Sequence, residues 1–181
     1  AAGGVGSLAG QIFKIAGCNV YGIAGGKEKC EMLINDFGFD GAIDYKSENL
    51  NESLGKFCPN GADIVYDNVG GRILNDCLLH LALNARIAIC GIISRHKTDN
   101  MNFGPENYSN LIFKRATMQG FLMLDYVSET VLARKKMKKW IEDGKLICKE
   151  DMREGFENAP DTLKGLFDGK NKGKQLLKIT D

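Results

Sequence analysis

The sequence predicts an α/β protein in which helices cover both faces of a doubly wound parallel sheet. Short apolar runs alternate along the chain with amphipathic segments, which is the pattern of strands joined by crossover helices. The apolar runs are continuous and do not alternate with polar residues, as is typical of strands buried on both faces. A glycine-rich stretch, AAGGVGSLAG (residues 1–10), leads directly into the first amphipathic segment.

The elements follow in order from local patterns. In residues 5–17, Leu8, Ile12 and Ile15 recur at helical spacing, and Gly17 is a typical helix end. Similar patterns predict further helices at 26–38, 48–58, 71–83, the start of 110–122, 126–144 and around 157–167. Strand-sized apolar runs predict strands at 19–25, 41–46, 62–71, 85–93, the end of 110–122, just after Lys145 and at 174–179. A polar loop is expected at 94–109.

Composition gives no overall sign of several classes of partner, although it does not exclude a local basic patch. With 24 basic and 23 acidic residues the net charge is +1, which gives no overall attraction to nucleic acid or to an anionic membrane. The six cysteines include no C-x-x-C pair and the chain has two histidines, so we expect no zinc site. No apolar run approaches membrane length and no signal-peptide pattern is present. Reduced cysteines inside apolar runs favour a cytoplasmic protein.

The opening loop has the composition of a phosphate-binding loop. Gly3, Gly4 and Gly6, with Val5 between them, allow the backbone to approach a pyrophosphate at a helix N-terminus, where N–H groups and the helix dipole favour negative charge. Gly10 then lets the helix pack closely on the sheet. The alternative is a tight turn without a ligand. The helix and strand that follow favour a Rossmann-type dinucleotide site.

The end of the strand predicted at 19–25 indicates which dinucleotide binds. NAD-specific sites place an acidic residue there, about 20 residues after the glycines, to accept the ribose hydroxyls. Here the strand ends GIAGGKEK (22–29), with no acid at its tip and with Lys27 and Lys29 nearby. Ammonium groups without a carboxylate suit the 2′-phosphate of NADP(H). The alternative is that these lysines form a solvated helix start, although lysine is unfavourable near a helix N-terminus.

Six stretches together resemble one family, in order and spacing. They are residues 1–30, FDGAIDYK (39–46), VYDNVGG (65–71), IAICGIIS (87–94), KRATMQGF (114–121) and GKNKGKQ (169–175). Over nearly its whole length the chain resembles the zinc-free medium-chain dehydrogenase/reductase superfamily. The most similar branch is that of leukotriene hydroxydehydrogenase/prostaglandin reductase and the curcumin or alkenal double-bond reductases. The resemblance implies NADPH-dependent reduction of the C=C bond of an α,β-unsaturated ketone or aldehyde, with hydride transfer to the β-carbon and protonation of the enolate.

The resemblance also implies cofactor contacts along the chain. The pyrophosphate would be held by Gly3, Gly4, Val5 and Gly6, and the 2′-phosphate by Lys29 and Tyr45. The remaining contacts would come from Asn68, from Cys90, Gly91, Ile93 and Ser94 beside the nicotinamide ribose, from the backbone of Phe121 to Met123 at the carboxamide, and from Asn171.

Each of these residues has a simpler interpretation. Tyr45 is also compatible with an ordinary aromatic at a strand end, and Asn171 with a plain loop. The stretch DNVGG (67–71) suits a strand-ending turn, since asparagine and glycine favour turns. Cys90 is compatible with a packed core thiol, in which case any cofactor contact there is made by the backbone.

The chain departs from the family at one position near the substrate. Two places after CGIIS the family usually carries a tyrosine, whereas here His96 stands there. His96 is a candidate to donate a proton or hydrogen bond to the substrate carbonyl or enolate. A surface loop histidine is the alternative, and no other catalytic residue is predicted.

The family's organisation implies two parts in this chain. Residues 1–144 would be the NADP-binding domain, without its first strand and without the N-terminal catalytic domain, and residues 145–181 would return towards that domain. A homodimer pairing near 114–121 is implied as well. The alternatives are an NADPH:quinone reductase of the same superfamily, a non-catalytic NADPH-binding module, and nucleic-acid binding through ARKKMKKW (133–140). That last stretch reads as an amphipathic helix with a solvated basic face.

Overall fold

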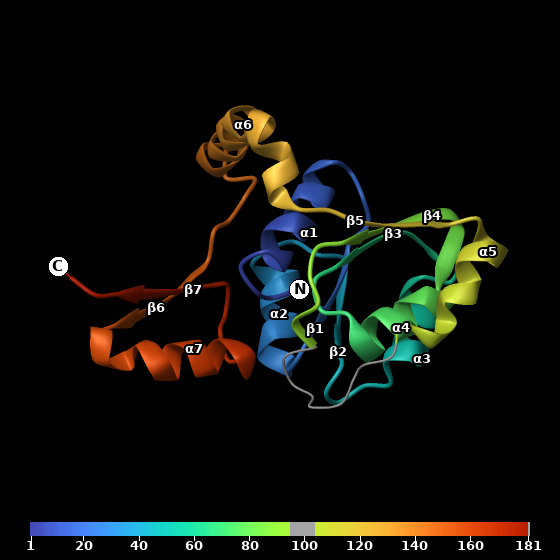
Figure 1. The fold of residues 1–181 in the computed structure, drawn as a ribbon, viewed down its shortest axis with the longest axis horizontal. Coiled ribbons are helices and arrows are strands. Elements are labelled where there is room, and N and C mark those ends of the chain that lie inside the picture. The colour runs from blue at the N-terminus through green and yellow to red at the C-terminus, as the bar shows by residue number, and fades with distance from the viewer. Residues whose placement is uncertain (95–103, 181) are drawn as a thin grey trace. The chain divides into compact units, whose positions relative to one another are not determined.

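The computed structural model describes residues 1–94 and 104–180, and it confirms the α/β class. Within these residues the strands form three sheets, in the orders β1-β2, β3-β4-β5 and β6-β7, and every pairing is parallel (Figure 1). Parallel sheets need helical crossovers, which is what the alternating sequence pattern predicted. His96 lies outside the described residues.

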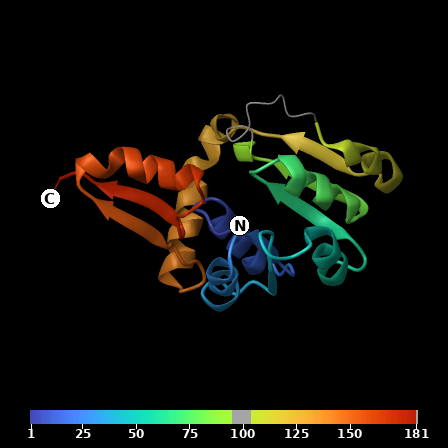
Figure 2. The same ribbon diagram turned by 90° about the horizontal axis from the view of Figure 1, so that it is seen from below.

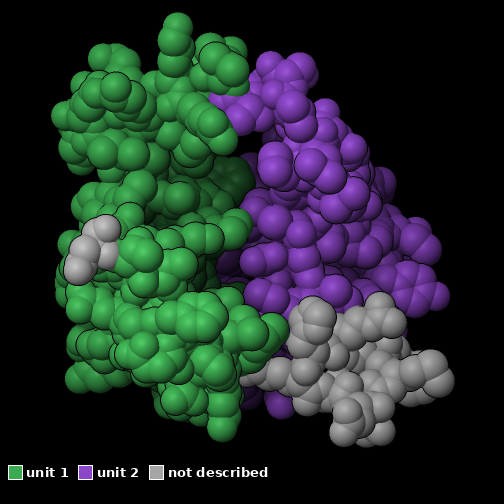
Figure 3. Space-filling model, turned by 60° about the vertical axis from the view of Figure 1, so that its left-hand side comes forward, with its two compact units in different colours: residues 1–48, 131–181 green, residues 49–130 purple. Residues whose placement is uncertain are grey.

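The described chain divides into two compact units (Figure 3). Unit 1 comprises residues 1–48 and 131–181, and unit 2 comprises residues 49–130. The predicted division between a cofactor domain ending at residue 144 and a tail of 145–181 stays a prediction.

Unit 1 contains the N-terminal elements and the tail. Its elements are α1 (Gly6–Ile15), β1 (Tyr21–Ala24), α2 (Lys27–Asn35), β2 (Gly41–Asp44), nearly all of α6 (Thr130–Glu142), β6 (Glu150–Glu154), η4 (Phe156–Asn158), α7 (Ala159–Phe167) and β7 (Lys174–Lys178). Figure 2 shows α7 lying along the β6-β7 pair. These elements match the predicted order of helices and strands in both parts of the unit.

The core of unit 1 forms where α1 and α2 pack on β1 and β2. Its buried side chains are Ala2, Val20, Ala24, Met32, Leu33, Phe37 and Phe39. A Cβ atom added to Gly10 of α1 would lie 2.0 Å from Cζ of Phe39, so a side chain at that position has no room. The predicted packing role of Gly10 is therefore confirmed.

Unit 2 is a three-stranded parallel sheet with its helices. The elements are α3 (Leu50–Phe57), β3 (Ala62–Asp67), α4 (Gly71–Leu79), β4 (Leu81–Ile89), η2 (Glu106–Ser109), α5 (Asn110–Lys114), β5 (Thr117–Gly120) and η3 (Met123–Glu129). β4 lies between β3 and β5, and Ile87 faces Val65 on one side and Met118 on the other. The buried core consists of Leu74, Leu78, Leu81, Ala85 and Ile87.

The boundary between α4 and β4 differs from the sequence prediction. A helix was expected over 71–83 and a strand over 85–93, whereas β4 already begins at Leu81 and ends at Ile89. The cause is pairing with β3, because Ala62 donates its N–H to the carbonyl of His80 at 2.7 Å. The β3–β4 register then shifts, and Asn84 adopts a left-handed φ of 62°. The run of leucines in this region carries no sign of that irregularity.

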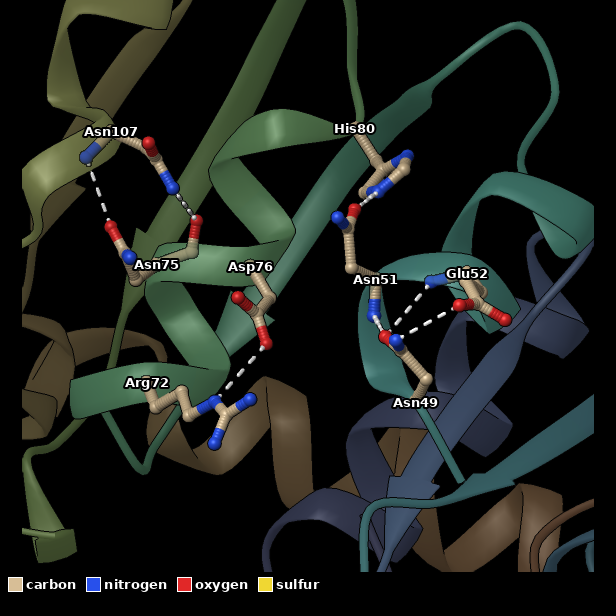
Figure 4. A network of polar contacts seen from close by, with 8 residues as sticks. All are labelled: Asn49, Asn51, Glu52, Arg72, Asn75, Asp76, His80 and Asn107. Carbon is tan, nitrogen blue, oxygen red and sulfur yellow. Dashed lines mark hydrogen bonds and ion pairs between the residues drawn. The ribbon is translucent and has the colours of Figure 1, made fainter.

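A polar network in unit 2 fixes the start of α3 and the entry to η2 (Figure 4). The Oδ1 atom of Asn49 accepts the backbone N–H groups of Asn51 and Glu52 at 3.1 and 3.3 Å. Asn107 donates its N–H to Oδ1 of Asn75 and its side-chain amide to the Asn75 carbonyl, both at 2.9 Å. These contacts satisfy backbone groups that a helix end or a loop would otherwise leave unpaired.

Replacing Asn49 with alanine is expected to lower the free energy of unfolding by about 1 kcal/mol, because the first turn of α3 loses its capping oxygen. Urea denaturation at equilibrium measures the change. Asn49→Asp retains a capping oxygen and serves as the matched control, so it should keep near-wild-type stability. An equal loss in both variants would show that the cap is not the cause.

Candidate nucleotide-binding site

The predicted cofactor residues lie near the carboxyl ends of parallel strands or beside the glycine loop. Ligands of open α/β sheets bind at this edge, outside the carboxyl ends of the strands. Unit 1 holds Gly3, Gly4, Val5, Gly6, Lys29, Tyr45 and Asn171. Unit 2 holds Asn68, Cys90, Gly91, Ile93, Ser94, Phe121 and Met123.

The glycine loop leads directly into α1, whose first turn has no side-chain cap. Gly3 accepts the N–H of Ser7 at 3.0 Å as the chain turns into the helix. The first turn of α1 carries no acidic residue, and the N-cap Val5 makes no side-chain capping bond. Backbone N–H groups of a helix start without such a cap are suited to a phosphate.

The tail of unit 1 lies against this loop. Gly3 forms a parallel bridge with Gly173, and a Cβ atom on Gly4 would lie 2.9 Å from Cδ of Lys174. Asn171 is buried and donates its side-chain amide to the carbonyl of Gly173 at 2.9 Å. The amide nitrogen is also 3.8 Å from the position of a Cβ on Gly3. The structure therefore brings Asn171 next to the glycine loop, where the resemblance implied a late cofactor contact.

The turn after β1 is organised by Asp44, which the sequence analysis did not single out. Its buried carboxylate accepts the N–H groups of Gly26 and Lys46 at 2.7 and 3.0 Å and the hydroxyl of Ser47 at 2.8 Å. These donors, the Gly26 N–H first, hold the pKa of Asp44 below its ordinary value. The carboxylate is thus occupied by internal donors. The signal in the sequence was an acid at a strand end with a serine three residues later.

The structure places Lys29 in the first turn of α2 and the Tyr45 side chain over the residue after β1. The Lys29 ammonium donates to the carbonyl of Gly169 at 2.5 Å, and burial followed by the charge of Lys46 lowers its pKa. A Cβ on Gly25 would lie 2.9 Å from the Tyr45 hydroxyl, so the phenol passes over the residue that follows β1. The Lys27 side chain is 88% exposed, and its ammonium group lies 3.7 Å from the carboxylate of Glu31.

In unit 2 the segments that follow β3 and β4 lie side by side. Cys90 donates its N–H to the carbonyl of Asp67 at 2.7 Å, and Ile93 donates to the carbonyl of Asn68 at 3.4 Å. A Cβ on Gly91 would lie 2.2 Å from Oδ1 of Asn68, so glycine is required where the two segments meet. Asn68, Cys90, Gly91 and Ile93 therefore lie together, and their contact with a cofactor stays a prediction.

Ser94 carries a buried hydroxyl that has no partner among the described residues. Its Oγ atom is inaccessible to solvent, and residues 1–94 and 104–180 offer it no hydrogen bond. A Cβ on Gly71 would lie 3.0 Å from this oxygen, which places it at the start of α4. Buried polar groups are nearly always satisfied, so an orphaned hydroxyl fits a site that a polar ligand completes.

Aromatic side chains gather near the ends of β3 and β5. The Phe121 ring lies 6.4 Å from Tyr66 and 6.3 Å from Tyr126, measured between ring centroids. Burial raises the pKa of Tyr66, and a hydrogen bond with the Cys90 side chain raises it further. The Cys90 thiol is thus engaged with a neighbouring side chain, in agreement with a packed thiol. Met123 remains 65% exposed.

Residues 1–94 and 104–180 contain no group of three His, Cys, Asp or Glu side chains placed to hold a metal ion. No helix in the same ranges combines the length and the apolar character needed to cross a bilayer. The absence of a zinc site from the protein stays a prediction.

Comparisons with known proteins agree with the family resemblance. The family model described as zinc-binding dehydrogenase matches residues 4–139. The NADP-dependent 2-alkenal reductase of Nicotiana tabacum is 42% identical over 99% of this chain and 52% of its own length. The NADPH-dependent curcumin reductase of Escherichia coli (strain K12) is 38% identical over 99% of this chain and 53% of its own length.

A solved structure gives the same result for the fold. The structure of CurA from Vibrio vulnificus in complex with NADPH superposes with a TM-score of 0.93 at 40% identity, covering 99% of this chain and 55% of that one. The resemblance to the curcumin and alkenal reductase branch and the predicted fold class are confirmed. The chain spans about half the length of these relatives.

Proposed function

Because the chain belongs to the zinc-binding dehydrogenase family and is similar throughout to alkenal and curcumin reductases, we propose that it binds NADP(H). It would be the cofactor-binding portion of an oxidoreductase that reduces the C=C bond of α,β-unsaturated ketones and aldehydes. The observation that carries the proposal is the end of β1, a strand with no acid at its tip, where the Tyr45 hydroxyl lies over Gly25 and Lys29 stands in the first turn of the following helix α2. Positive charge without a carboxylate suits a 2′-phosphate better than free ribose hydroxyls.

The described residues fit the rest of the cofactor. The open N-terminus of α1 would take the pyrophosphate, with Asn171 beside it. In unit 2, Asn68, the segment from Cys90 to Ser94 and the backbone of Phe121 to Met123 would hold the nicotinamide half. The orphaned Ser94 hydroxyl would gain a hydrogen-bond partner there.

When bound, NADPH supplies a hydride for the β-carbon of the substrate. The residues of this chain would position the nicotinamide for that transfer, and His96 remains the proposed proton or hydrogen-bond donor to the enolate oxygen or carbonyl. We also propose a small-molecule substrate and a homodimer pairing near residues 114–121, both from the resemblance alone.

Parallel titrations with NADPH and NADH test the cofactor. Fluorescence of the single Trp140 and of the nicotinamide should report saturable binding that is tighter for NADPH. Tighter binding of NADH would contradict the phosphate argument and leave the fold unaffected. No binding of either cofactor would contradict the proposed cofactor role.

Turnover tests the reaction. The protein that carries this chain should oxidise NADPH in the presence of an α,β-unsaturated ketone, and faster than in the presence of a quinone. The opposite order would favour the quinone reductase alternative. NADPH binding without turnover of either substrate would favour a non-catalytic binding module.

A further inference from the structure

Lys46 lies close to the proposed phosphate-binding residues. It follows Tyr45 directly after β2, and its backbone N–H donates to the Asp44 carboxylate at 3.0 Å. A Cβ on Gly25 would lie 2.9 Å from Cε of Lys46, the same distance as from the Tyr45 hydroxyl. The Lys46 side chain therefore passes over the residue that follows β1, alongside the phenol.

Charges of both signs surround this turn. Burial lowers the pKa of Lys29 and the charge of Lys46 lowers it further, whereas the charge of Asp151 raises it. The Asp44 carboxylate is occupied by internal donors, and Lys172 is already paired with Glu28. Among the described residues, none of the ion pairs includes Lys29 or Lys46. Like charges repel each other, and an anion bound by both ammonium groups would remove this repulsion.

We propose that Lys46 is a specificity-determining residue whose ammonium group binds the 2′-phosphate together with Lys29 and so selects NADPH over NADH. This inference rests on the proposed function. An ammonium group has three donors, and Lys29 already gives one to the carbonyl of Gly169. A doubly charged phosphate with three acceptor oxygens is better satisfied by two cations than by one. Lys27 is a weaker candidate for the second cation, since its ammonium group lies 3.7 Å from the carboxylate of Glu31.

The test compares cofactor affinities of Lys46→Gln with those of the wild-type chain. We expect NADPH binding to weaken by about tenfold, which is the loss of one charge-assisted contact, while NADH binding stays within about twofold. The dinucleotide fragment 2′,5′-ADP should weaken in parallel with NADPH, because it carries the same phosphate. Lys46→Arg retains the cation and should retain the preference. Lys135→Gln on α6 removes the same charge from an exposed site and should change neither affinity.

The outcomes separate this inference from the proposed function. A wild-type chain that prefers NADPH, together with a Lys46→Gln variant that keeps the same preference, would overturn the role of Lys46 alone. Equal weakening of NADPH and NADH in Lys46→Gln would also overturn it, since Lys46 would then act through the shape of the turn. A wild-type chain with no preference for NADPH would overturn the proposed cofactor and this inference together.

Discussion

Gly10→Ala is expected to lower the free energy of unfolding by about 3 kcal/mol, at the upper end of the usual cost of overpacking a core. The added methyl group would lie within 3 Å of three atoms of the Phe39 ring, at 2.0, 2.7 and 2.8 Å. The ring is 4% exposed and packed in the core of unit 1, so it cannot swing into solvent without loss of burial. Denaturation by urea, followed by circular dichroism, measures the effect.

Two further variants identify the cause. Gly165 lies inside α7 with nothing within 4 Å of its Cβ position, so Gly165→Ala should stabilise the chain by up to about 1 kcal/mol through helix propensity. The same substitution thus has opposite signs in two helices of unit 1. Phe39→Leu makes room at the contact, and Gly10→Ala should cost less in that background than in the wild type. If Gly10→Ala lowers the free energy of unfolding as much in the Phe39→Leu background as in the wild type, the contact with the Phe39 ring is not the cause.

Asp44→Ala is expected to cost about 3 kcal/mol and to weaken NADPH binding. The substitution leaves the N–H groups of Gly26 and Lys46 without their acceptor in a partly buried turn. The same turn places Tyr45 and begins the helix that carries Lys29, so the proposed phosphate site should loosen with it. Equilibrium denaturation and NADPH titration measure the two effects. Unchanged NADPH affinity in a folded variant would contradict the positioning role.

The acid dependence of stability gives an independent check on Asp44. Its folded-state pKa is lowered, so its ionised form contributes stability that is present above the unfolded value of about 3.9 and is lost as the pH falls through the folded value. Asp44→Asn removes this titration, and the variant should lose less stability than the wild type between pH 7 and 3. Asp63→Asn, at an exposed position on β3, serves as the control and should follow the wild type.

The sequence predicted most of the fold because, for most elements, the local residue pattern agrees with the pairing and packing that the element makes in the structure. Helical spacing before Gly17 identified α1, and the strand predicted at 62–71 contains β3, which ends at Asp67. The start of β4 could not be predicted, because the chain around Leu81 is apolar enough for either element. Whether this stretch is helix or strand is decided by its pairing with β3 and by the left-handed backbone of Asn84.

The candidate site divides in the same way. Lys29 could be proposed from the sequence because its spacing from the glycine loop places it just after the strand predicted at 19–25. The bond from Gly26 to Asp44 and the approach of Lys46 to Gly25 could not be predicted, because they join residues about 20 positions apart in the chain. Ser94 was expected beside the cofactor, but the missing partner of its hydroxyl is a property of three-dimensional packing.

The bridge between Gly3 and Gly173 has a consequence for how the protein is made. The glycine loop is synthesised well before the residues that lie against it, Asn171 and Lys174. Proteins fold from the N-terminus as they are synthesised, so α1 and β1 would emerge long before the loop has these neighbours. A nascent chain is therefore expected to gain affinity for the proposed nucleotide only after residues 171–174 have emerged, and a chain cut before Asn171 would leave the loop unsupported.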